Sequence, residues 1–356
     1  MEKEFDLLVF IGRFQPFHIA HQRVIEQALE KSNKVLVLVG SSGNPRSTRN
    51  PFTYEERQKM ILESFSFTDG TQNRIVIKPL YDKTYNDSAW IKQVQDAVVQ
   101  VGLEVANPDG FHLNGLADIK VGLIGAAKDH TSYYLKMFPQ WGSVDVSLED
   151  IMHATVVREH YLDGSFQRYM IQGTMVNKRV ADFLFDEFIH TEEYQQLRRE
   201  LQHVRDYKKA WAAAPYPVKH VTCDAVVEQS GHVLLVKRRA EPGKGLWALP
   251  GGHLEEHERL LDGVIRELRE ETMIKVPVPV LKGSIVQTQM FDDPHRSNIG
   301  RVITFAAHIK LPSEASLPKV KGSDDAEKAK WVPISELKEN QFFDDHYHIL
   351  CYFLGI

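Results

Sequence analysis

One acidic stretch in the C-terminal third of the chain limits what the chain can fold into. Residues 252–274 read GHLEEHERLLDGVIRELREETMI. Glu267, Glu270 and Glu271 are spaced i, i+3 and i+4, so a helix places all three carboxylates on one face. The apolar residues recur with the same helical period on a separate face: Leu261, Val264, Ile265 and Leu268. The stretch therefore predicts a helix with one face in a core and three carboxylates gathered beside it.

Such crowding of carboxylates has a chemical meaning. Like charges at this spacing repel by roughly 0.2–0.5 kcal/mol per pair, so they occur on a well-solvated surface or around a bound cation. Oxygen ligands favour a hard ion, Mg²⁺ or Mn²⁺. Such an ion polarises a diphosphate and lowers the pKa of an attacking water. We therefore predict Glu267, Glu270 and Glu271 as metal ligands, with Glu267 and Glu271 catalytic.

The spacing of this stretch resembles the Nudix box. Gly252 is followed after five residues by Glu258 and after seven more by RELREE, residues 266–271. The family has glycine where Met273 stands, because glycine suits a left-handed residue just past a helix. Methionine there costs about 1 kcal/mol of strain, or the helix ends differently. A solvated acidic helix face is the alternative. The resemblance implies an α/β/α sandwich and metal-dependent hydrolysis of a nucleoside diphosphate derivative.

Further residues of this region belong to the same resemblance. PHRSNIGR, residues 294–301, is similar to the substrate loop of ADP-ribose-cleaving members, which implies substrate contacts by Arg296, Arg301 and Gly252. Glu327 is a candidate additional metal ligand or general base, with an exposed loop acid as the alternative. Phe291 and Trp247 are candidate adenine-stacking residues, or core.

The N-terminal part shows a different pattern. Short apolar runs at 7–11, 35–39, 75–77 and 121–124 read as strands buried on both faces. Helical patterns at 19–31, 54–65 and 88–101 lie between them. This alternation predicts a doubly wound parallel sheet, in which ligands bind beyond the carboxyl ends of the strands.

The loop after the first predicted strand is GRFQPFHIAH, residues 12–21. It matches neither the dinucleotide fingerprint nor the Walker pattern. Gly12 permits close approach of the backbone, and a helix starting near Ala20 offers an anion-binding N-terminus. His18 and His21 lie on one side of this turn, where imidazoles can donate to phosphate oxygens. Structural or solvated histidines are the alternative.

This loop resembles the HxGH signature of the nucleotidyltransferase superfamily, with Ala20 in the glycine position. HATVVR, residues 153–158, resembles the second signature of that superfamily, although a plain helix start is the alternative. The resemblance implies a Rossmann-like domain in which Thr155 and Arg158 hold the ATP phosphates.

Four segments narrow the resemblance to nicotinamide mononucleotide (NMN) adenylyltransferases of the type fused to a Nudix domain: IGRFQPFH, TRNPFTYEER (48–57), DKTYNDSAWI (82–91) and GAAKDHTSYYLKMFPQW (125–141). The resemblance implies that Trp90 stacks on the nicotinamide, as a π-face suits a cationic ring. A core aromatic is the alternative. It also implies that Asp82 and Asn86 orient the amide or ribose, and Arg49 follows the second strand, where it meets phosphate or solvent. The implied ATP contacts are Gly12, Arg13, Phe14, His18, His21, Lys128, Asp129, Thr155 and Arg158.

The reaction implied is in-line attack by the 5′-phosphate of NMN on the ATP α-phosphorus. That phosphate is already an anion at pH 7, so no strong general base is needed. Catalysis then depends on positioning and charge stabilisation by His18, His21, Arg158, Lys128 and Mg²⁺ (or Mn²⁺).

Composition sets the remaining limits. The 356 residues predict two domains, at 1–185 and 218–356, joined by a helical linker at 186–217 that Pro215 and Pro217 end. A net charge of −5 gives no footprint for nucleic acid. Cys223 and Cys351 are too few for a disulfide framework, so we expect the cytoplasm. No apolar run approaches the ~18 residues of a membrane helix. A homo-oligomer remains open.

The favoured interpretation is a bifunctional enzyme of NAD metabolism, with ATP, NMN and ADP-ribose as substrates. Two alternatives remain. One is nucleotidyl transfer to flavin or phosphopantetheine, joined to a different Nudix pyrophosphatase. The other is a Nudix domain that only senses ADP-ribose or NAD. Met273 favours the sensor, while the intact Glu267, Glu270 and Glu271 oppose it.

Overall fold

The computed structural model describes residues 3–65, 70–107, 119–125, 137–146, 154–314, 316–322 and 326–356. The chain divides into two compact units, which we call unit 1 (Met1–Arg198) and unit 2 (Arg199–Ile356). The division falls inside helix α7 (Glu192–Ala210), within the segment predicted as a helical linker. Among the described residues, none of the helices has the length and apolarity needed to cross a membrane.

Unit 1 is built on a parallel sheet. Its described strands are in the order β3-β2-β1-β4-β5 and every pairing between them is parallel. The strands are β1 (Phe5–Gly12), β2 (Ser32–Val39), β3 (Ile75–Pro79), β4 (Val121–Gly125) and β5 (Gly142–Asp145). The helices between them are α1 (Ile19–Lys31), α2 (Tyr54–Glu63) and α3 (Asp87–Ala106), with a short 3-10 helix η1 (Thr71–Arg74). The predicted doubly wound fold is confirmed, and β5 is the strand that the apolar runs did not predict.

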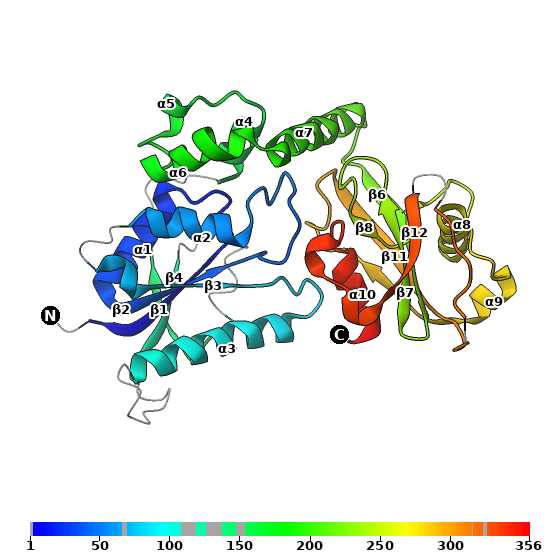
Figure 1. The fold of residues 1–356 in the computed structure, drawn as a ribbon, viewed down its shortest axis with the longest axis horizontal. Coiled ribbons are helices and arrows are strands. Elements are labelled where there is room, and N and C mark those ends of the chain that lie inside the picture. Colours follow the sequence, from blue (N-terminus) through cyan, green and yellow to red (C-terminus); the bar gives the residue numbers. More distant parts are fainter. Residues whose placement is uncertain are drawn as a thin grey trace. The chain divides into compact units, whose positions relative to one another are not determined.

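Helices cover both faces of this sheet. Figure 1 shows α1 and α2 on one side of the sheet and α3 on the other. Alternate residues of β1, such as Leu7 and Val9, pack in one buried cluster with Val94 and Val98 of α3. Strand order reverses between β1 and β4, so the crevice at their carboxyl ends is where a ligand is expected. The GRFQPFH loop begins at that edge.

Shorter elements complete unit 1. They are α4 (Ala154–Leu162), α5 (Arg168–Ile171), α6 (Lys178–Asp182), η4 (Phe183–Glu187) and η5 (Phe188–His190). HATVVR contributes the first turns of α4, so its described residues do form a helix start.

Unit 2 contains a mixed sheet. Within the described residues its strands are in the order β10-β11-β6-β7-β12, with β8 added to β7 and β9 to β6. β11 and β6 are parallel, and the other pairs are antiparallel. The strands are β6 (Lys219–Gln229), β7 (His232–Arg238), β8 (Trp247–Ala248), β9 (Gly251–His253), β10 (Ile285–Phe291), β11 (Arg301–Lys310) and β12 (Ala326–Pro333). The remaining elements are α8 (Leu260–Thr272), α9 (Val278–Gly283), η6 (Ile334–Glu336), η7 (Glu339–Gln341) and α10 (His346–Leu354).

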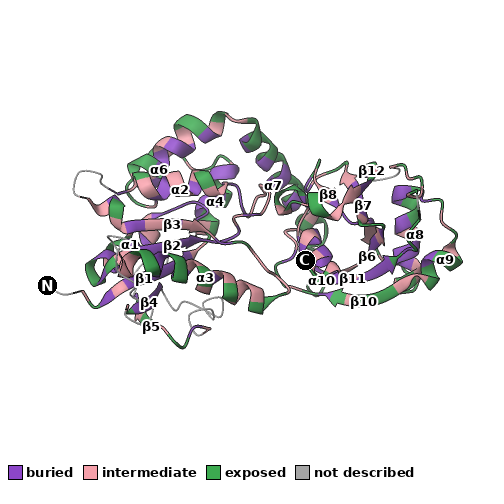
Figure 2. Ribbon diagram, turned by 60° about the horizontal axis from the view of Figure 1, so that its bottom comes forward, coloured by how far each residue is buried: buried purple, intermediate pink, exposed green. Residues whose placement is uncertain are grey.

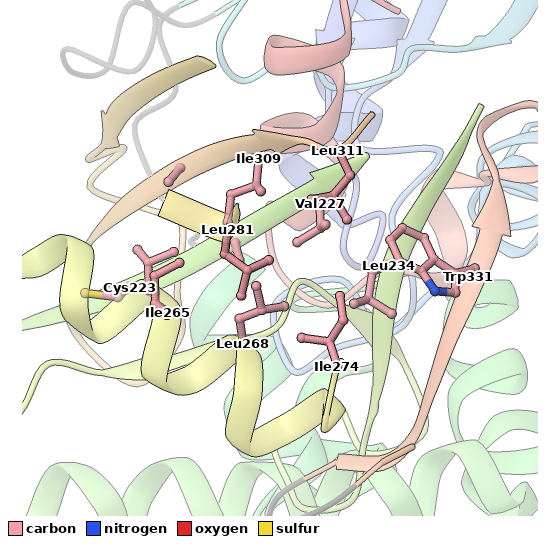
Figure 3. Close-up of a cluster of buried hydrophobic side chains, with 13 residues drawn as sticks. Cys223, Val227, Leu234, Ile265, Leu268, Ile274, Leu281, Ile309, Leu311 and Trp331 are labelled. Atoms are coloured by element: carbon pink, nitrogen blue, oxygen red, sulfur yellow. The ribbon is translucent and has the colours of Figure 1, made fainter. Parts of the chain in front are cut away.

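The carboxylate helix is α8, and three residues of its predicted apolar face, Val264, Ile265 and Leu268, lie in the core. The fourth, Leu261, is 40% exposed, because it lies in the first turn of the helix, beyond the edge of that core. Ile265 and Leu268 pack with Cys223 and Val227 of β6 in the cluster drawn in Figure 3. Buried and exposed residues alternate around α8 (Figure 2). On the opposite face of the sheet, Phe353 of α10 lies against His308 and Phe291, with ring centroids 5.6 Å apart in each pair. The predicted α/β/α sandwich is confirmed.

Met273 ends α8 in the left-handed region, with φ 48° and ψ 31°. Its N–H donates to the carbonyl of Arg269 at 2.9 Å. Of the two outcomes expected for this position, the chain therefore takes the strained one, since a side chain in this region costs about 1 kcal/mol or more.

Candidate active sites

The first site lies between β1 and α1. His18 is the N-cap of α1, and its Nδ1 accepts a hydrogen bond from the main-chain N–H of His21 at 3.4 Å. The two imidazole rings are stacked with centroids 3.5 Å apart. His18 is buried and His21 half-buried. The predicted pair therefore meets at a helix N-terminus, where main-chain N–H groups and the helix dipole favour an anion.

Phe14 packs beneath this pair. A Cβ on Gly12 would lie 2.8 Å from Cζ of Phe14, so the ring needs a glycine there. The ring is 1% exposed and meets the imidazole of His21 edge-on, with centroids 4.9 Å apart. The side chain of Phe14 thus supports His21, and any contact of Phe14 with ATP falls to its main chain.

Arg158 joins three segments around the same site. Its Nη1 donates to the carbonyl of Gln15 and its Nε to the carbonyl of Thr48, both at 3.0 Å. Its Nη2 donates to Oγ1 of Thr155 at 3.3 Å. Arg158 and Thr155 are therefore in contact, and Arg158 also fixes the loop that follows β1; their role toward the ATP phosphates stays a prediction.

Three arginines gather here. Burial, together with the nearby charges of Arg13 and Arg49, lowers the pKa of Arg158 to about 10. Burial also lowers the pKa of Arg13 to about 10, and a guanidinium with such a pKa still holds its proton at pH 7. A group of like charges beside a helix N-terminus favours a polyanion such as a triphosphate.

Three residues predicted to bind NMN lie around the start of α3. Asn86 is the N-cap of α3, and its Oδ1 accepts from the N–H of Ala89 at 3.0 Å. Oδ2 of Asp82 accepts from Nδ2 of Asn44 at 3.1 Å. Trp90 is half-buried at the margin of the core. These contacts lie within the fold, and the roles of the three residues toward NMN stay predictions.

Two predicted ATP contacts, Lys128 and Asp129, lie outside the described residues. Arg46 also follows β2, and its guanidinium is paired with a carboxylate of α2. It forms a two-pronged ion pair with Glu56, with both N–O distances 2.7 Å.

The second site lies where β9 meets α8. The N–H of Gly251 donates to Oε2 of Glu271 at 2.9 Å. A Cβ on Gly252 would lie 2.5 Å from Oε1 of Glu267, and one on Gly251 would lie 2.2 Å from Oδ1 of Asp224. Gly251 is therefore needed, because its Cβ would also lie 2.4 Å from the main-chain oxygen of Cys223, whereas a Cβ on Gly252 would require the end of the Glu267 side chain to move.

These carboxylates perturb one another. Burial raises the pKa of Glu271 to about 8; the Gly251 N–H opposes this, while Glu267 and Asp224 add to it. Burial also raises the pKa of Glu267. A divalent cation would offset both the burial and the mutual repulsion.

Arg266 organises the acidic side of α8. It donates to Glu258 from Nη2 at 2.6 Å and from Nε at 3.0 Å. Its Nη1 donates to Glu267 at 2.8 Å and to Glu270 at 2.9 Å. The hydrogen bonds from Arg266 lower the pKa of Glu258. Arg266 thus pairs with Glu258, Glu267 and Glu270 together.

The residues present fit a hard cation in their chemistry. Glu267 and Glu271 offer oxygen donors beside the cradle formed by Gly251 and Gly252. Among the residues that the structure describes, no three His, Cys, Asp or Glu side chains are arranged to hold an ion. Glu270 is exposed and bound to Arg266, so its role as a third ligand remains a prediction.

The two substrate-loop arginines differ. Arg296 is buried and forms a two-pronged ion pair with Asp345, at 2.8 and 2.9 Å. Arg301 is half-buried and donates from Nη1 to the carbonyl of Asp292 at 2.5 Å. Arg296 therefore fastens the loop to the start of α10, while Arg301 is the better placed of the two for a substrate.

Glu327 is exposed in β12, at a break in the strand pairing. Ala326 pairs with Arg238 and Lys328 with Lys237, so Glu327 is the extra, bulged residue. Bulges commonly redirect side chains beside active sites. Phe291 is core, at 1% exposed, and Trp247 is half-buried in β8.

Two charged residues of these sites were not singled out as site residues by the sequence analysis. Asp224 interrupts the apolar run VTCDAVV, and a lone carboxylate in a buried strand is a signal that could have indicated it. Its Oδ2 accepts from Oγ1 of buried Thr304. Arg57 ends the TRNPFTYEER segment and is 1% exposed. Only its contacts, across distant segments, show what it does.

The fold and the two sites define a nucleotidyltransferase joined to a Nudix hydrolase, and comparison with known proteins agrees. Residues 9–108 match the model of the Cytidylyltransferase-like family, and residues 218–353 match that of the NUDIX domain. A nicotinamide/nicotinic acid mononucleotide adenylyltransferase of Acinetobacter baylyi is 45% identical over 164 residues, 45% of this chain and 78% of the relative. An ADP-ribose pyrophosphatase of Methanocaldococcus jannaschii is 32% identical over 130 residues, 36% of this chain and 70% of the relative.

A solved structure matches the whole chain. It is a bifunctional NMN adenylyltransferase/ADP ribose pyrophosphatase from Francisella tularensis, complexed with AMP and a manganese ion. It is 33% identical, covers 99% of both chains and has a TM-score of 0.87. The present chain belongs to this family of bifunctional NMN adenylyltransferase/ADP-ribose pyrophosphatases.

Proposed function

We propose that unit 1 converts NMN and ATP to NAD and pyrophosphate, and that unit 2 hydrolyses ADP-ribose to AMP and ribose 5-phosphate. The observation that supports the pair most directly is the opposite charge of the two sites. Arg13, Arg49 and Arg158 gather at the first site, and Glu267 and Glu271 at the second.

In unit 1 the chain supplies position and positive charge. His18 and His21 lie at the N-terminus of α1, where they can donate to phosphate oxygens. The arginines neutralise the charge that moves onto the leaving pyrophosphate as the NMN phosphate attacks. Trp90, Asp82 and Asn86 orient the nicotinamide side, and Mg²⁺ or Mn²⁺ would accompany the ATP.

In unit 2 the chain supplies oxygen ligands and a fixed acidic face. Glu267 and Glu271, with Glu270 as the third candidate, would hold Mg²⁺ or Mn²⁺ beside Gly252. When bound, such an ion would polarise the diphosphate and lower the pKa of the attacking water. Arg266 keeps Glu267 in place, Arg301 contacts the substrate, and Glu327 accepts a proton or adds an oxygen ligand.

A substrate screen with purified protein tests the proposal. ATP is supplied with NMN, flavin mononucleotide or phosphopantetheine, and ADP-ribose is supplied separately, each with Mg²⁺, Mn²⁺ or excess chelator. We expect NAD from NMN alone and AMP from ADP-ribose, with hydrolysis lost in chelator. Transfer to flavin or phosphopantetheine would replace the transferase assignment. Binding of ADP-ribose without turnover in either metal would make unit 2 a sensor.

We also infer that the protein works on small molecules in the cytoplasm, in keeping with its two free cysteines, Cys223 and Cys351.

A further inference from the structure

Arg57 of α2 is buried in a cage of main-chain carbonyls. Its Nη1 donates to the carbonyl of Arg13 at 2.8 Å and to that of Gly40 at 2.7 Å. Its Nε donates to the carbonyl of Thr53 at 3.0 Å, and its Nη2 to that of Ser41 at 3.3 Å. One side chain therefore joins the loop after β1, the loop after β2 and the start of α2.

The two loops that it joins are strained. Among the described residues of unit 1, the non-glycine residues with positive φ are Phe14, at 52°, and Ser41, at 51°. Arg57 bonds the carbonyl just before Phe14 and the carbonyl of Ser41 itself. Side chains persist in this region only where their surroundings compel it. The guanidinium supplies that constraint for both loops.

The constrained loops support the residues expected to meet ATP. Arg13 is anchored through its carbonyl, and its Cγ would lie 3.6 Å from a Cβ on Gly40. The ring of Phe14 packs against His21. Arg158 bonds the carbonyl of Gln15, the next residue of the same loop. A shift of this loop would therefore displace the arginine and the histidine together.

The charge of Arg57 also matters. Its hydrogen bonds go to neutral carbonyls, while the nearby carboxylates of Asp82, Glu55 and Glu56 offset part of its charge. Burial lowers the pKa of Arg57 to about 10, which still leaves it protonated at pH 7.

We propose that Arg57 is a positioning residue for adenylyl transfer. Its fork holds the loops after β1 and β2 in the strained form that aims Arg13 and His21 at the ATP phosphates. This inference rests on the transferase function proposed above. Lysine cannot replace the fork, because an ammonium has no planar set of donors and is a compact point charge.

The same unit offers a matched control at the other end of the sheet. Arg74 donates to the carbonyl of Asn33 at 2.9 Å and to those of Leu29 and Ser32 at 2.6 Å. These carbonyls lie between the end of α1 and the start of β2, away from the carboxyl edge. Arg74→Lys therefore removes a comparable brace without touching the site.

The test compares Arg57→Lys, Arg74→Lys and the wild type as full-length proteins, below the melting temperature of each. NAD synthesis gives kcat and the KM for ATP, calorimetry gives the Kd for ATP without NMN, and ADP-ribose hydrolysis shows that unit 2 is intact. For Arg57→Lys we expect the KM and Kd for ATP to rise about tenfold and kcat to fall about tenfold, since small misplacements cost up to roughly 100-fold. Arg74→Lys should change the melting temperature only.

A merely structural role gives a different result. Partial unfolding lowers the active fraction, and so the apparent kcat, but leaves the KM and Kd for ATP unchanged. That pattern in Arg57→Lys, or equal changes in both variants, overturns the proposal. If Arg57→Lys does not fold, Arg57→Gln, which keeps two donors without a buried charge, takes its place with the same criteria. A wild type that binds ATP without making NAD refutes the proposed function instead, and the ATP affinities still decide the role of Arg57.

Discussion

The two buried arginines at the candidate site of unit 1, Arg57 and Arg158, have different partners from the arginines of unit 2. In unit 1, Arg57 and Arg158 donate mainly to main-chain carbonyls, which carry no net charge. In unit 2, Arg296 is bonded to Asp345, and Arg266 to three glutamates. The same side chain therefore leaves a positive region in one unit and has its charge cancelled in the other.

The difference matches the chemistry of each site. A site that must hold a triphosphate gains from arginines whose charge remains available. A site that must hold a divalent ion needs carboxylates in excess, and Glu267, Glu271 and Asp224 lie together there; burial first, and then their mutual repulsion, raises the pKa of both glutamates. The arginines of unit 2 fix geometry, and those of unit 1 also supply charge.

The largest effect is expected at the buried ion pair of unit 2. Arg296→Met leaves Asp345 buried without its partner, which should lower the free energy of unfolding of unit 2 by about 3–5 kcal/mol. The double variant Arg296→Met/Asp345→Leu should recover most of the lost free energy of unfolding, because an apolar pair then takes the place of an unpaired buried charge. Chemical unfolding monitored through ADP-ribose hydrolysis measures both. An Arg296→Met protein of normal stability with a raised KM for ADP-ribose would restore the predicted substrate contact.

The next largest effect concerns the metal carboxylates. Glu271→Gln should lower ADP-ribose hydrolysis by about 100- to 1,000-fold, as expected when a preorganised electrostatic group is removed. NAD synthesis should not change. Glu270→Gln is the matched control, because Glu270 is exposed and bound to Arg266; it should lose less than tenfold. Equal losses in both variants would support the triple ligand set, and retained hydrolysis in Glu271→Gln would remove Glu271 from the site.

A smaller effect concerns pH. Burial raises the pKa of Asp344 to about 7, and neighbouring Asp345 adds to this. The folded form then keeps a proton that the unfolded chain releases near its ordinary value of 3.8. Stability of unit 2 should therefore fall by about 3 kcal/mol as pH rises from 4 to 7, and level off above 7. Asp344→Asn should remove this slope in urea unfolding curves. Asparagine suits the left-handed backbone of this residue, so an unchanged slope would point to another group.

The smallest effect is expected at Met273. Met273→Gly relieves the left-handed strain past α8 and should raise the free energy of unfolding of unit 2 by up to about 1 kcal/mol. Thermal melting measures it, with Met290→Gly in β10 as a control that should only destabilise. A drop in stability at Met273 would mean that its exposed side chain has contacts worth more than the strain.

Local patterns predicted much of this molecule. Helix α1 begins and ends at residues 19 and 31, as its periodicity indicated, and Met273 adopts the left-handed conformation of the glycine that it replaces. The parallel sheet followed from short apolar runs. β5 did not, because its sequence GSVD has a single apolar residue and its strand is largely exposed.

Contacts between distant segments could not be predicted in this way. Arg57 bonds carbonyls 17 and 44 residues away, and Arg296 bonds a carboxylate 49 residues away. No spacing rule connects such positions, so the sequence could not predict the ion pair of Arg296 with Asp345 or the carbonyl partners of Arg57. Only the three-dimensional structure shows which arginines donate to main-chain carbonyls and which pair with carboxylates.

The most direct test of the account uses His21→Ala, assayed for both reactions in one sample. His21 belongs to the positive site of unit 1, so NAD synthesis from NMN and ATP should fall by about 100-fold or more. Hydrolysis of ADP-ribose should stay within twofold of the wild type. Unchanged NAD synthesis, or a parallel loss of both activities, would contradict two separate centres of opposite charge on one chain.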